Sequence, residues 1–239
     1  MVVVVAVLFG GDFEEAVASE KNKDYKKAAE LYQKEAQKGD MTAQFNLGNM
    51  YEKGLGVKQD SKAAYKWRKK SAQQGLDNAQ YNLALMYQDG IGVKKDYTKA
   101  FYWYKKAAEQ GIAMAQHNLA LMYQKGIGVK KDYAKAFYWY KKAAEQGIVE
   151  AQTNLGNMYA RGQGVKQNYK KAVEWFRKAA KKGFVGAQYN MGLMYVYGNG
   201  VKEDRIKAYQ WWMKAAKQGD SPSQHNLDLL CKQSPWACK

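Results

Sequence analysis

Apolar residues recur with helical spacing in short segments of the chain. One set, spaced by four, three and one residues, consists of Ala43, Leu47, Met50 and Tyr51. This spacing puts the side chains on one face of a helix and predicts a helix over about 44–53. The glycine-rich segment 54–57 follows, and glycine beyond the last turn is typical of a helix end.

A second helix is predicted directly after this loop. Asp60 suits its N-cap, because an aspartate carboxylate accepts hydrogen bonds from the free N–H groups of a first turn. Ala64, Trp67 and Ala72 then lie on one face, and Gly75 marks the end. The pattern therefore predicts a pair of amphipathic helices.

The pair recurs every 36 residues without insertion, and the period is plain at several positions. One position holds Asp24, Asp60, Asp96, Asp132, Asn168 and Asp204, and another holds Gln44, Gln80, Gln116, Gln152, Gln188 and Gln224. Residues 96–131 and 132–167 are identical at 26 of 36 positions, which indicates a recent duplication. Since neither helix of a pair can bury its apolar face alone, stacked pairs must share a core, and the fold class is an all-α solenoid.

The repeated residues resemble a known family. The second full repeat carries Ala79, Gln80, Asn82, Leu83, Ala84, Tyr87, Gly90, Gly92, Val93, Asp96, Lys99, Ala100, Trp103, Tyr104, Lys106, Ala107, Ala108 and Gly111. This pattern is similar to the Sel1-like repeat, a relative of the tetratricopeptide repeat. The resemblance implies a right-handed superhelix of antiparallel helix pairs. Five units fit it, at 41–75, 77–111, 113–147, 149–183 and 185–219.

The two ends depart from the repeat, as terminal repeats commonly do. Residues 12–40 resemble a plain tetratricopeptide helix pair without the glycine loop, and Asp12 with Glu15 predicts a capping box at its start. Five repeats occupy 41–220, and 221–239 reads as a solitary capping helix with a short tail.

The first eleven residues and the two cysteines bear on the compartment. Residues 1–11 contain an apolar run that resembles a secretory signal peptide without its basic start; the alternative is a short extension on a cytoplasmic protein. Cys231 and Cys238 are seven residues apart with Pro235 between them, which allows a disulfide, although two free thiols remain the alternative. Together these features favour a periplasmic or secreted bacterial protein.

The sequence lacks the motifs of common enzymes. No Ser-x-x-Lys motif of penicillin-recognising enzymes occurs, nor does His-Glu-x-x-His. The two histidines, His117 and His225, hold the same position three repeats apart, which is too far for a shared metal. We therefore expect no catalysis, no metal and no cofactor.

One row of tryptophans invites two interpretations. It consists of Trp67, Trp103, Trp139, Trp175 and Trp211. Beside small alanines, this row predicts core packing; a ladder that stacks nucleic-acid bases is the alternative.

Variable positions on the first helices predict a binding surface. By resemblance to tetratricopeptide units, two slots per repeat face a concave groove. These slots hold Phe45, Asn49, Tyr81, Leu85, His117, Leu121, Thr153, Asn157, Tyr189 and Leu193. Such a stripe suits an extended peptide or a helix. The alternative is that these side chains pack between neighbouring units.

An invariant asparagine row is the second candidate feature of the groove. It consists of Asn46, Asn82, Asn118, Asn154, Asn190 and Asn226. An amide both donates and accepts, so the row could clamp a peptide backbone; equally, it could make hydrogen bonds within the scaffold.

The predicted function is that of a protein-interaction scaffold of the bacterial envelope. The net charge is +17 and is spread along the chain, which favours a partner that is acidic in part and leaves RNA or another anionic polymer as an alternative partner. A penicillin-recognising enzyme is the weaker alternative. No apolar run is long enough for a membrane span.

Overall fold

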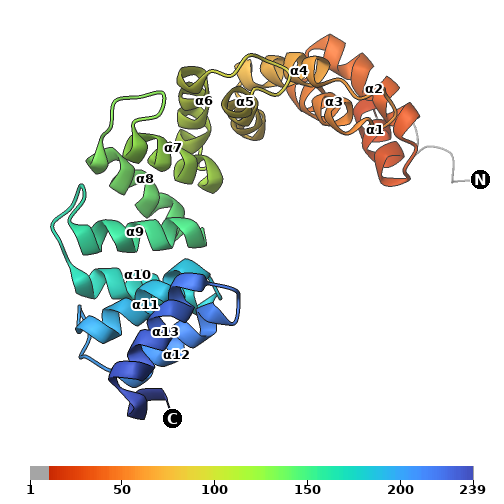
Figure 1. Ribbon diagram of the computed structural model, residues 1–239. Helices are drawn as coiled ribbons and strands as arrows, with labels where there is room; N and C mark the ends of the chain where they lie inside the picture. The colour runs from red at the N-terminus through yellow and green to blue at the C-terminus, as the bar shows by residue number, and fades with distance from the viewer. Residues whose placement is uncertain (1–10, 239) are drawn as a thin grey trace, which may run out of the picture. The chain divides into compact units, whose positions relative to one another are not determined.

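The computed structural model describes residues 11–238, and the regular secondary structure of this part of the chain is entirely helical (Figure 1). The helices are α1 (Asp12–Lys21), α2 (Tyr25–Lys38), α3 (Met41–Lys53), α4 (Ser61–Gln73), α5 (Asp77–Asp89), α6 (Tyr97–Glu109), α7 (Ala113–Lys125), α8 (Tyr133–Glu145), α9 (Val149–Arg161), α10 (Tyr169–Lys181), α11 (Val185–Tyr197), α12 (Arg205–Ala216), α13 (Ser221–Gln233) and the 3-10 helix η1 (Pro235–Cys238). The all-α class and the repeated helix pairs predicted above are confirmed.

The described chain divides into two compact units. The first extends to Ala115 and includes 127–129, and the second comprises 116–126 and 130–238. Within the first unit, α3 packs on α4 and α5 on α6, and each pair also packs on the next through α4 and α5. The second unit repeats this arrangement from α8 to α13. Each helix pair therefore buries its apolar face partly against its own partner and partly against the neighbouring pair.

The predicted end of α3 and start of α4 are confirmed, and they arise from the glycine and the capping aspartate that predicted them. Asp60 caps α4, since its Oδ1 accepts from the backbone N–H of Lys62 at 2.8 Å and of Ala63 at 3.1 Å. Gly54 ends α3 in the left-handed conformation, with a φ of 68°. The one difference lies at the start of α3, which begins at Met41 and is capped by Asp40, three residues before the expected Gln44.

The second glycine of each loop has a role that helix termination does not explain. Gly56 also has a positive φ, and a Cβ there would overlap the backbone carbonyl of Tyr25 in the preceding pair. Gly92 stands in the same relation to the carbonyl of Ser61. The loop therefore lies directly on the start of the previous second helix, and only glycine allows that approach.

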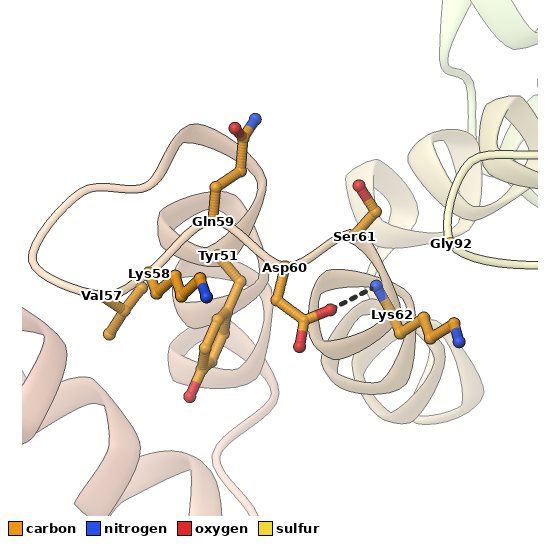
Figure 2. Close-up of a pocket in the computed structure, with 8 residues that line it drawn as sticks. All are labelled: Tyr51, Val57, Lys58, Gln59, Asp60, Ser61, Lys62 and Gly92. Carbon is orange, nitrogen blue, oxygen red and sulfur yellow. Dashed lines mark hydrogen bonds between the residues drawn. The ribbon is translucent and has the colours of Figure 1, made fainter.

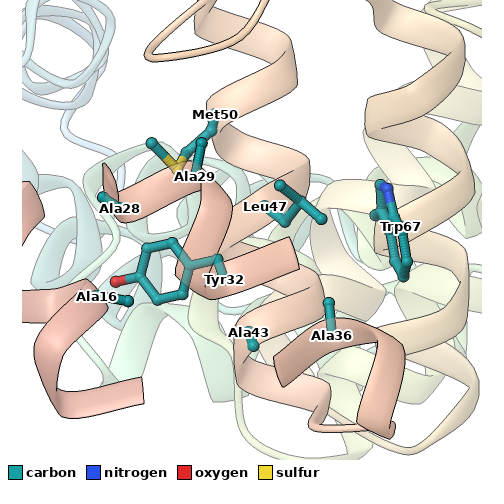
Figure 3. Packing of buried hydrophobic residues seen from close by; sticks show 9 residues of the cluster. All are labelled: Ala16, Ala28, Ala29, Tyr32, Ala36, Ala43, Leu47, Met50 and Trp67. Carbon is teal, nitrogen blue, oxygen red and sulfur yellow. The ribbon is translucent and has the colours of Figure 1, made fainter. Parts of the chain in front are cut away.

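The core is built from small residues at the helix crossings and larger ones between them. Figure 3 shows the cluster of the first unit, in which Leu47 and Tyr32 fill the space left by a set of alanines. These alanines are Ala16, Ala28, Ala29, Ala36 and Ala43. Alanine at a crossing lets two helices approach closely, so the buried surface is large although the side chains are small.

The tryptophan row does not form the deep core that was predicted. Trp67 is buried at 8% exposure, but the other four tryptophans are only half-buried. The deep position is one residue later and holds Arg68, Tyr104, Tyr140, Phe176 and Trp212. The indoles instead lie at the edge of the second helix, where a lysine three residues on covers several of them; Lys178 Nζ is 4.1 Å from the Trp175 ring centroid.

A glutamine ladder ties neighbouring pairs together. Gln44 Nε2 donates to the Ala36 carbonyl of the preceding pair at 3.1 Å. Its Oε1 accepts from Gln74 Nε2 at 2.9 Å, and the same Gln74 nitrogen also donates to the Gly39 carbonyl at 2.9 Å. Gln80 and Gln110 repeat these bonds one period later. Each rung adds a side-chain donor to a helix-end carbonyl, such as that of Ala36, which also accepts from the Gly39 backbone N–H at 3.3 Å.

The capping box predicted at the start of α1 is wrong. Gly11 occupies the N-cap and makes no side-chain bond, while Asp12 is the first residue of the helix. The Asp12 carboxylate instead pairs with Lys34 and Lys38 of α2, which lowers its pKa, chiefly through the hydrogen bond from Lys34. The carboxylate thus links two helices rather than closing the first turn of one.

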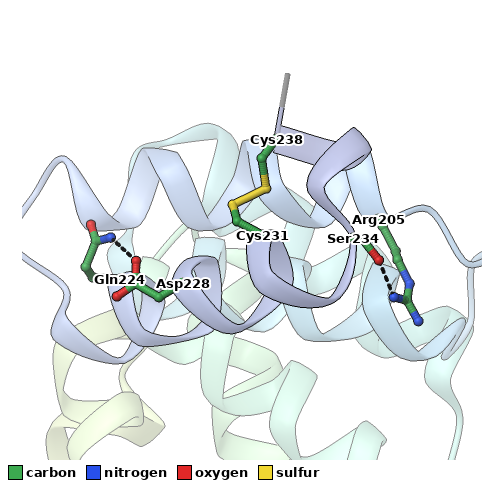
Figure 4. Close-up of a disulfide and its surroundings, with 6 residues drawn as sticks. All are labelled: Arg205, Gln224, Asp228, Cys231, Ser234 and Cys238. Carbon is green, nitrogen blue, oxygen red and sulfur yellow. Dashed lines mark hydrogen bonds between the residues drawn. A yellow bond between two sulfur atoms is a disulfide. The ribbon is translucent and has the colours of Figure 1, made fainter.

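At the C-terminal end, α13 is followed by a short tail that is closed by a disulfide (Figure 4). Cys231 and Cys238 are joined with a Cα–Cα distance of 5.7 Å. Beside them, Arg205 Nη1 of α12 donates to Ser234 Oγ at 2.5 Å. The tail is therefore tied both to α13 and to α12.

The signal-like segment predicted at 1–11 lies, apart from Gly11, outside the described residues. From Gly11 to Cys238, every helix is too short or too polar to cross a bilayer.

Candidate partner-binding surface

The ten residues predicted to line a groove lie on the first helix of successive pairs, and we call them the first-helix strip. In the first unit they are Phe45 and Asn49 on α3 and Tyr81 and Leu85 on α5. In the second unit they are His117, Leu121, Thr153, Asn157, Tyr189 and Leu193 on α7, α9 and α11. All except Thr153 are half-buried. Several of them are already engaged in contacts within their own unit.

Asn49 is held by a buried arginine. Arg68 is 3% exposed, and its Nη2 donates to Asn49 Oδ1 at 2.7 Å. The same guanidinium binds the Glu52 carboxylate through two bonds of 2.8 and 2.6 Å. The hydrogen bonds from Arg68 lower the pKa of Glu52, so the pair stays charged at neutral pH. Asn49 thus helps to orient an ion pair in which Arg68 is buried and Glu52 is partly exposed, and its oxygen is engaged by the arginine.

Tyr81 and Leu85 differ in how far their side chains are available to a partner. The Tyr81 ring packs against Tyr104, with ring centroids 5.9 Å apart. Tyr104 is itself fully buried, and its hydroxyl donates to Gln88 Oε1 at 2.9 Å. Leu85 remains half-buried and apolar. In the first unit, Phe45 and Leu85 are therefore the strip residues whose side chains are apolar, partly accessible and without hydrogen bonds.

His117 in the second unit serves packing. Its ring lies 5.7 Å from the Tyr140 ring, and its Nε2 lies 3.5 Å from Asn154 Nδ2. Burial lowers the pKa of His117, so the imidazole is neutral at neutral pH. A neutral ring against an aromatic ring is a packing arrangement rather than a charged binding group.

Thr153 does not belong to a binding surface, and its prediction is corrected here. It is 6% exposed, and its Oγ1 donates to the Val149 carbonyl one turn earlier at 3.0 Å. Asn157 is also engaged, because its Oδ1 accepts from Asn190 Nδ2 at 3.2 Å. The burial of Thr153 and the bond made by Asn157 remove both strip positions of α9 from the accessible surface.

The last pair of strip residues packs at the C-terminal end of the second unit. Tyr189 and Leu193 contact the core cluster around Trp212 and Leu227. The Trp212 indole donates to the Tyr189 carbonyl at 3.1 Å. Leu193, like Leu121, keeps part of its apolar side chain accessible.

Two residues of the candidate asparagine clamp are engaged inside the second unit. Asn154 Nδ2 lies 3.5 Å from His117 Nε2, and Asn190 Nδ2 donates to Asn157 Oδ1. Both contacts join a first helix to the preceding pair. For these two asparagines, the structure supports the scaffold interpretation of the row.

Sequence reasoning missed the buried position on the second helix that directly follows the tryptophan. The residue at this position faces a small residue on the first helix, and the two vary together from repeat to repeat. Gly48 faces Arg68, Gly156 faces Phe176 and Gly192 faces Trp212; in each case a Cβ would collide with the larger side chain. Where the first helix has Ala84 or Ala120, the slot holds a tyrosine. This covariation was present in the repeats and could have located the slot.

The outer edge of the second helices carries exposed aromatic and basic residues. Tyr102 and Tyr138 are each 51% exposed and lie edge-on to Trp103 and Trp139. Lysines cover these rings, as Lys142 does at 5.2 Å from the Tyr138 centroid. Between Gly11 and Cys238, no group of three His, Cys, Asp or Glu residues is arranged to hold a metal ion.

Comparisons with known proteins agree with the repeat architecture. The Sel1 repeat family model matches at 20–40, 42–76, 77–112, 113–148, 149–184 and 185–220. The first match falls in the segment that resembled a plain tetratricopeptide unit. A comparison with curated proteins gave no match.

Two solved structures are similar over nearly the whole chain. One is c5321, a protective antigen present in uropathogenic Escherichia coli strains, which is 37% identical with a TM-score of 0.85 over 94% of this chain. This chain covers 49% of the antigen, and so spans about half its length. The other is a Sel1 repeat protein from Oxalobacter formigenes, 33% identical with a TM-score of 0.80, over 91% of this chain and 87% of that one. By the match of its repeats and by these relatives, the chain belongs to the Sel1 repeat family.

Proposed function

We propose that this protein is a non-catalytic scaffold that binds a partner protein or peptide along the first-helix strip. One observation carries the proposal. In each unit, strip residues on different first helices have apolar side chains that remain partly accessible and make no hydrogen bonds. They are Phe45 and Leu85 in the first unit and Leu121 and Leu193 in the second.

The spacing of these residues favours an extended or helical peptide as the ligand. In the first unit, Phe45 on α3 and Leu85 on α5 each offer an apolar contact, so a partner segment that crosses these two helices would meet one contact per helix. In the second unit, α7 and α11 offer such contacts and α9 does not. The engaged residues Asn49, Tyr81 and Asn157 would shape the rigid floor beneath it. A rigid surface limits the entropy that binding costs.

The experiment is an affinity capture with the full chain and two matched triple variants. The strip variant carries Leu85→Ala, Leu121→Ala and Leu193→Ala. The outer-edge variant carries Tyr102→Ala and Tyr138→Ala with Lys142→Ala. Both truncate three side chains to alanine, and circular dichroism checks that each variant remains helical before it is used.

A protein retained by the wild type and the outer-edge variant, but lost by the strip variant, supports the proposal. The retained protein is then tested as a purified partner, where the strip variant should weaken binding at least tenfold. Equal retention by all three baits would contradict binding at the strip.

An anionic polymer, including RNA, is the second candidate partner, and the outer edge favours it. Lysines at one repeat position stack over aromatic rings there, among them Lys70 on Trp67, Lys178 on Trp175 and Lys214 on Trp211. Ammonium groups beside aromatic rings bind phosphates and can stack bases. Here the outer-edge variant, not the strip variant, should lose binding, and the affinity should fall steeply with salt.

We also propose a periplasmic or secreted location in the bacterial envelope. The bond between Cys231 and Cys238 supports this, because disulfides persist in oxidising compartments and are rare in the cytosol. The test is fractionation of the native host followed by alkylation of unreduced protein. Envelope-fraction protein that resists alkylation supports the location, and fully alkylated cytosolic protein contradicts it.

A further inference from the structure

A lysine clasp recurs at the loop edge of the repeats. Lys99 Nζ lies 3.1 Å from Asp96 Oδ2 and 5.6 Å from the ring centroid of Tyr87. Lys207 repeats this in the second unit, at 2.9 Å from Asp204 Oδ2 and 5.6 Å from the Tyr195 centroid. Each ammonium is thus held between the helix-capping carboxylate and the face of a tyrosine.

The clasp occurs in two further repeats. Lys135 pairs with Asp132 at 3.2 Å and lies 5.5 Å from the Tyr123 centroid. In the repeat with Asn168 at the cap, Lys171 still lies 5.5 Å from the Tyr159 centroid. The ammonium therefore lies over the tyrosine ring in all four repeats, and it also pairs with a carboxylate in the three that have aspartate at the cap.

The first full repeat has the pocket without the lysine. Ala63 stands where the other repeats carry Lys99, Lys135, Lys171 and Lys207. Asp60 keeps its capping bonds through Oδ1. Its Oδ2 makes no ion pair or hydrogen bond with any residue between Gly11 and Cys238.

The Tyr51 ring is also less covered than Tyr87, Tyr123 and Tyr159, which are buried; Tyr195 is half-buried, as Tyr51 is. Tyr87 meets the Tyr65 ring edge-on at 5.7 Å, and Tyr159 meets Phe137 at 5.2 Å. For Tyr51 of the first full repeat, the residue equivalent to Tyr65 and Phe137 is Ala29, which has no aromatic ring to cover it. Two independent substitutions, Ala29 and Ala63, therefore open the same site.

The opening is visible as a hollow between the loop and the start of α4. It measures about 830 Å³, and its lining includes Tyr51, Lys58, Asp60 and Lys62. The equivalent hollow at Tyr195, where Lys207 is present, measures about 440 Å³. Figure 2 shows the Asp60 carboxylate beside Tyr51, whereas the Lys62 side chain extends away from it.

We propose that this hollow binds a lysine or arginine side chain of a partner protein. The cation lies against Asp60 Oδ2 and the Tyr51 ring, as the chain's own lysines do in the other repeats. Lys58 does not fill the site, since its equivalents Lys94 and Lys202 coexist with an occupied clasp. Lys58 and Lys62 instead select a basic residue that has acidic neighbours, because they repel an isolated cation and attract flanking carboxylates.

The test uses short peptides and two designed variants of the full chain. The probes are acetyl-Glu-Lys-Glu-amide and the same peptide with norleucine, which has a side chain of similar length and no charge. Ala63→Lys gives the first repeat the lysine that fills the other clasps, so its fold should be retained. Lys99→Ala empties the clasp at Asp96 and Tyr87 and should create a second site.

Binding is followed by the backbone amide signals of Lys62 and Ala63, which report directly on Asp60. In the wild type the lysine peptide should shift these signals saturably, with at least tenfold weaker binding of the norleucine peptide. Ala63→Lys should abolish the shifts, and Lys99→Ala should add a second set at the amide of residue 99.

Equal binding of the two peptides, undiminished binding to Ala63→Lys, or no second site in Lys99→Ala would each overturn the proposal. The site uses none of the first-helix strip residues, so its failure would leave the proposed scaffold function standing.

Discussion

Lys182 replaces a glutamine of the ladder, and Gln152 is left with an unpaired oxygen. In other repeats this glutamine donates both to a loop carbonyl and to the buried glutamine on the first helix of its own pair, as Gln218 does with Gly183 and Gln188. Lys182 Nζ reaches the Gly147 carbonyl at 3.1 Å. Within the described chain, Gln152 Oε1 is buried and has no partner. This rung of the ladder therefore has the bond to the loop carbonyl but lacks the bond to the buried glutamine.

Lys182→Gln should therefore stabilise the second unit. Restoring a bond to a buried acceptor contributes about 1 kcal/mol, which corresponds to a rise of roughly 2–4 °C in Tm for a chain of this size. Gln110→Lys makes the reverse change in the first unit and should lower Tm. Thermal unfolding followed by circular dichroism measures both; an unchanged or lower Tm in Lys182→Gln would contradict the ladder's role.

Gly192→Ala should destabilise the packing of α11 against α12. An added Cβ would collide with the Trp212 indole, and overpacking of this kind costs about 1–3 kcal/mol. Trp212→Tyr should recover part of the loss, because alanine at this slot coexists with tyrosine in two other repeats. A double-mutant cycle from chemical denaturation gives the coupling, and strictly additive effects would show that the two positions do not constrain each other.

Loss of the disulfide should loosen the C-terminal tail. Closing so short a loop contributes about 2–3 kcal/mol in the loop-entropy model. The double variant Cys231→Ser and Cys238→Ser should therefore melt earlier than the oxidised wild type. Adding reductant should lower the Tm of the wild type alone. If reductant shifts both proteins equally, the effect does not come from this bond.

Acid should weaken the lysine clasps in a predictable window. Hydrogen bonds from the backbone N–H and ammonium of Lys99 lower the pKa of Asp96, and Lys207 lowers that of Asp204 in the same way. A lowered pKa in the folded state means that the stabilisation is complete above the ordinary aspartate pKa, near 4, and is lost as pH falls through the lowered value.

The variant with Asp96→Asn, Asp132→Asn and Asp204→Asn isolates this effect. Asparagine still caps a helix here, since Asn168 Oδ1 accepts from the Lys171 N–H at 3.0 Å. The Tm of the variant should be lower than that of the wild type at pH 7, and the difference should shrink between about pH 4 and pH 2. A difference independent of pH would mean that the carboxylate charge does not contribute.

The sequence alone determined the features that depend on local chemistry and repetition. The helix end at Gly54 and the cap at Asp60 follow from the backbone preferences of those residues, and the period of 36 follows from comparing the chain with itself. Helix pairs that cannot bury their faces alone must stack, so the fold class was predictable as well.

Only the tertiary structure decided which neighbouring side chain on a helix points inward. Trp67 and Arg68 differ by about 100° around the helix axis, and helical periodicity predicts burial of the tryptophan row. Packing against the first helix buries the next position instead, because the small residue opposite, such as Gly48, leaves room only there. Thr153 is likewise buried, and Asn190 bonds a neighbouring first helix, which the repeat pattern alone did not decide. The sequence shows that residue 63 is alanine and not lysine. Its consequence for binding depends on the distance between the Asp60 carboxylate and the Tyr51 ring, which only the folded chain brings together.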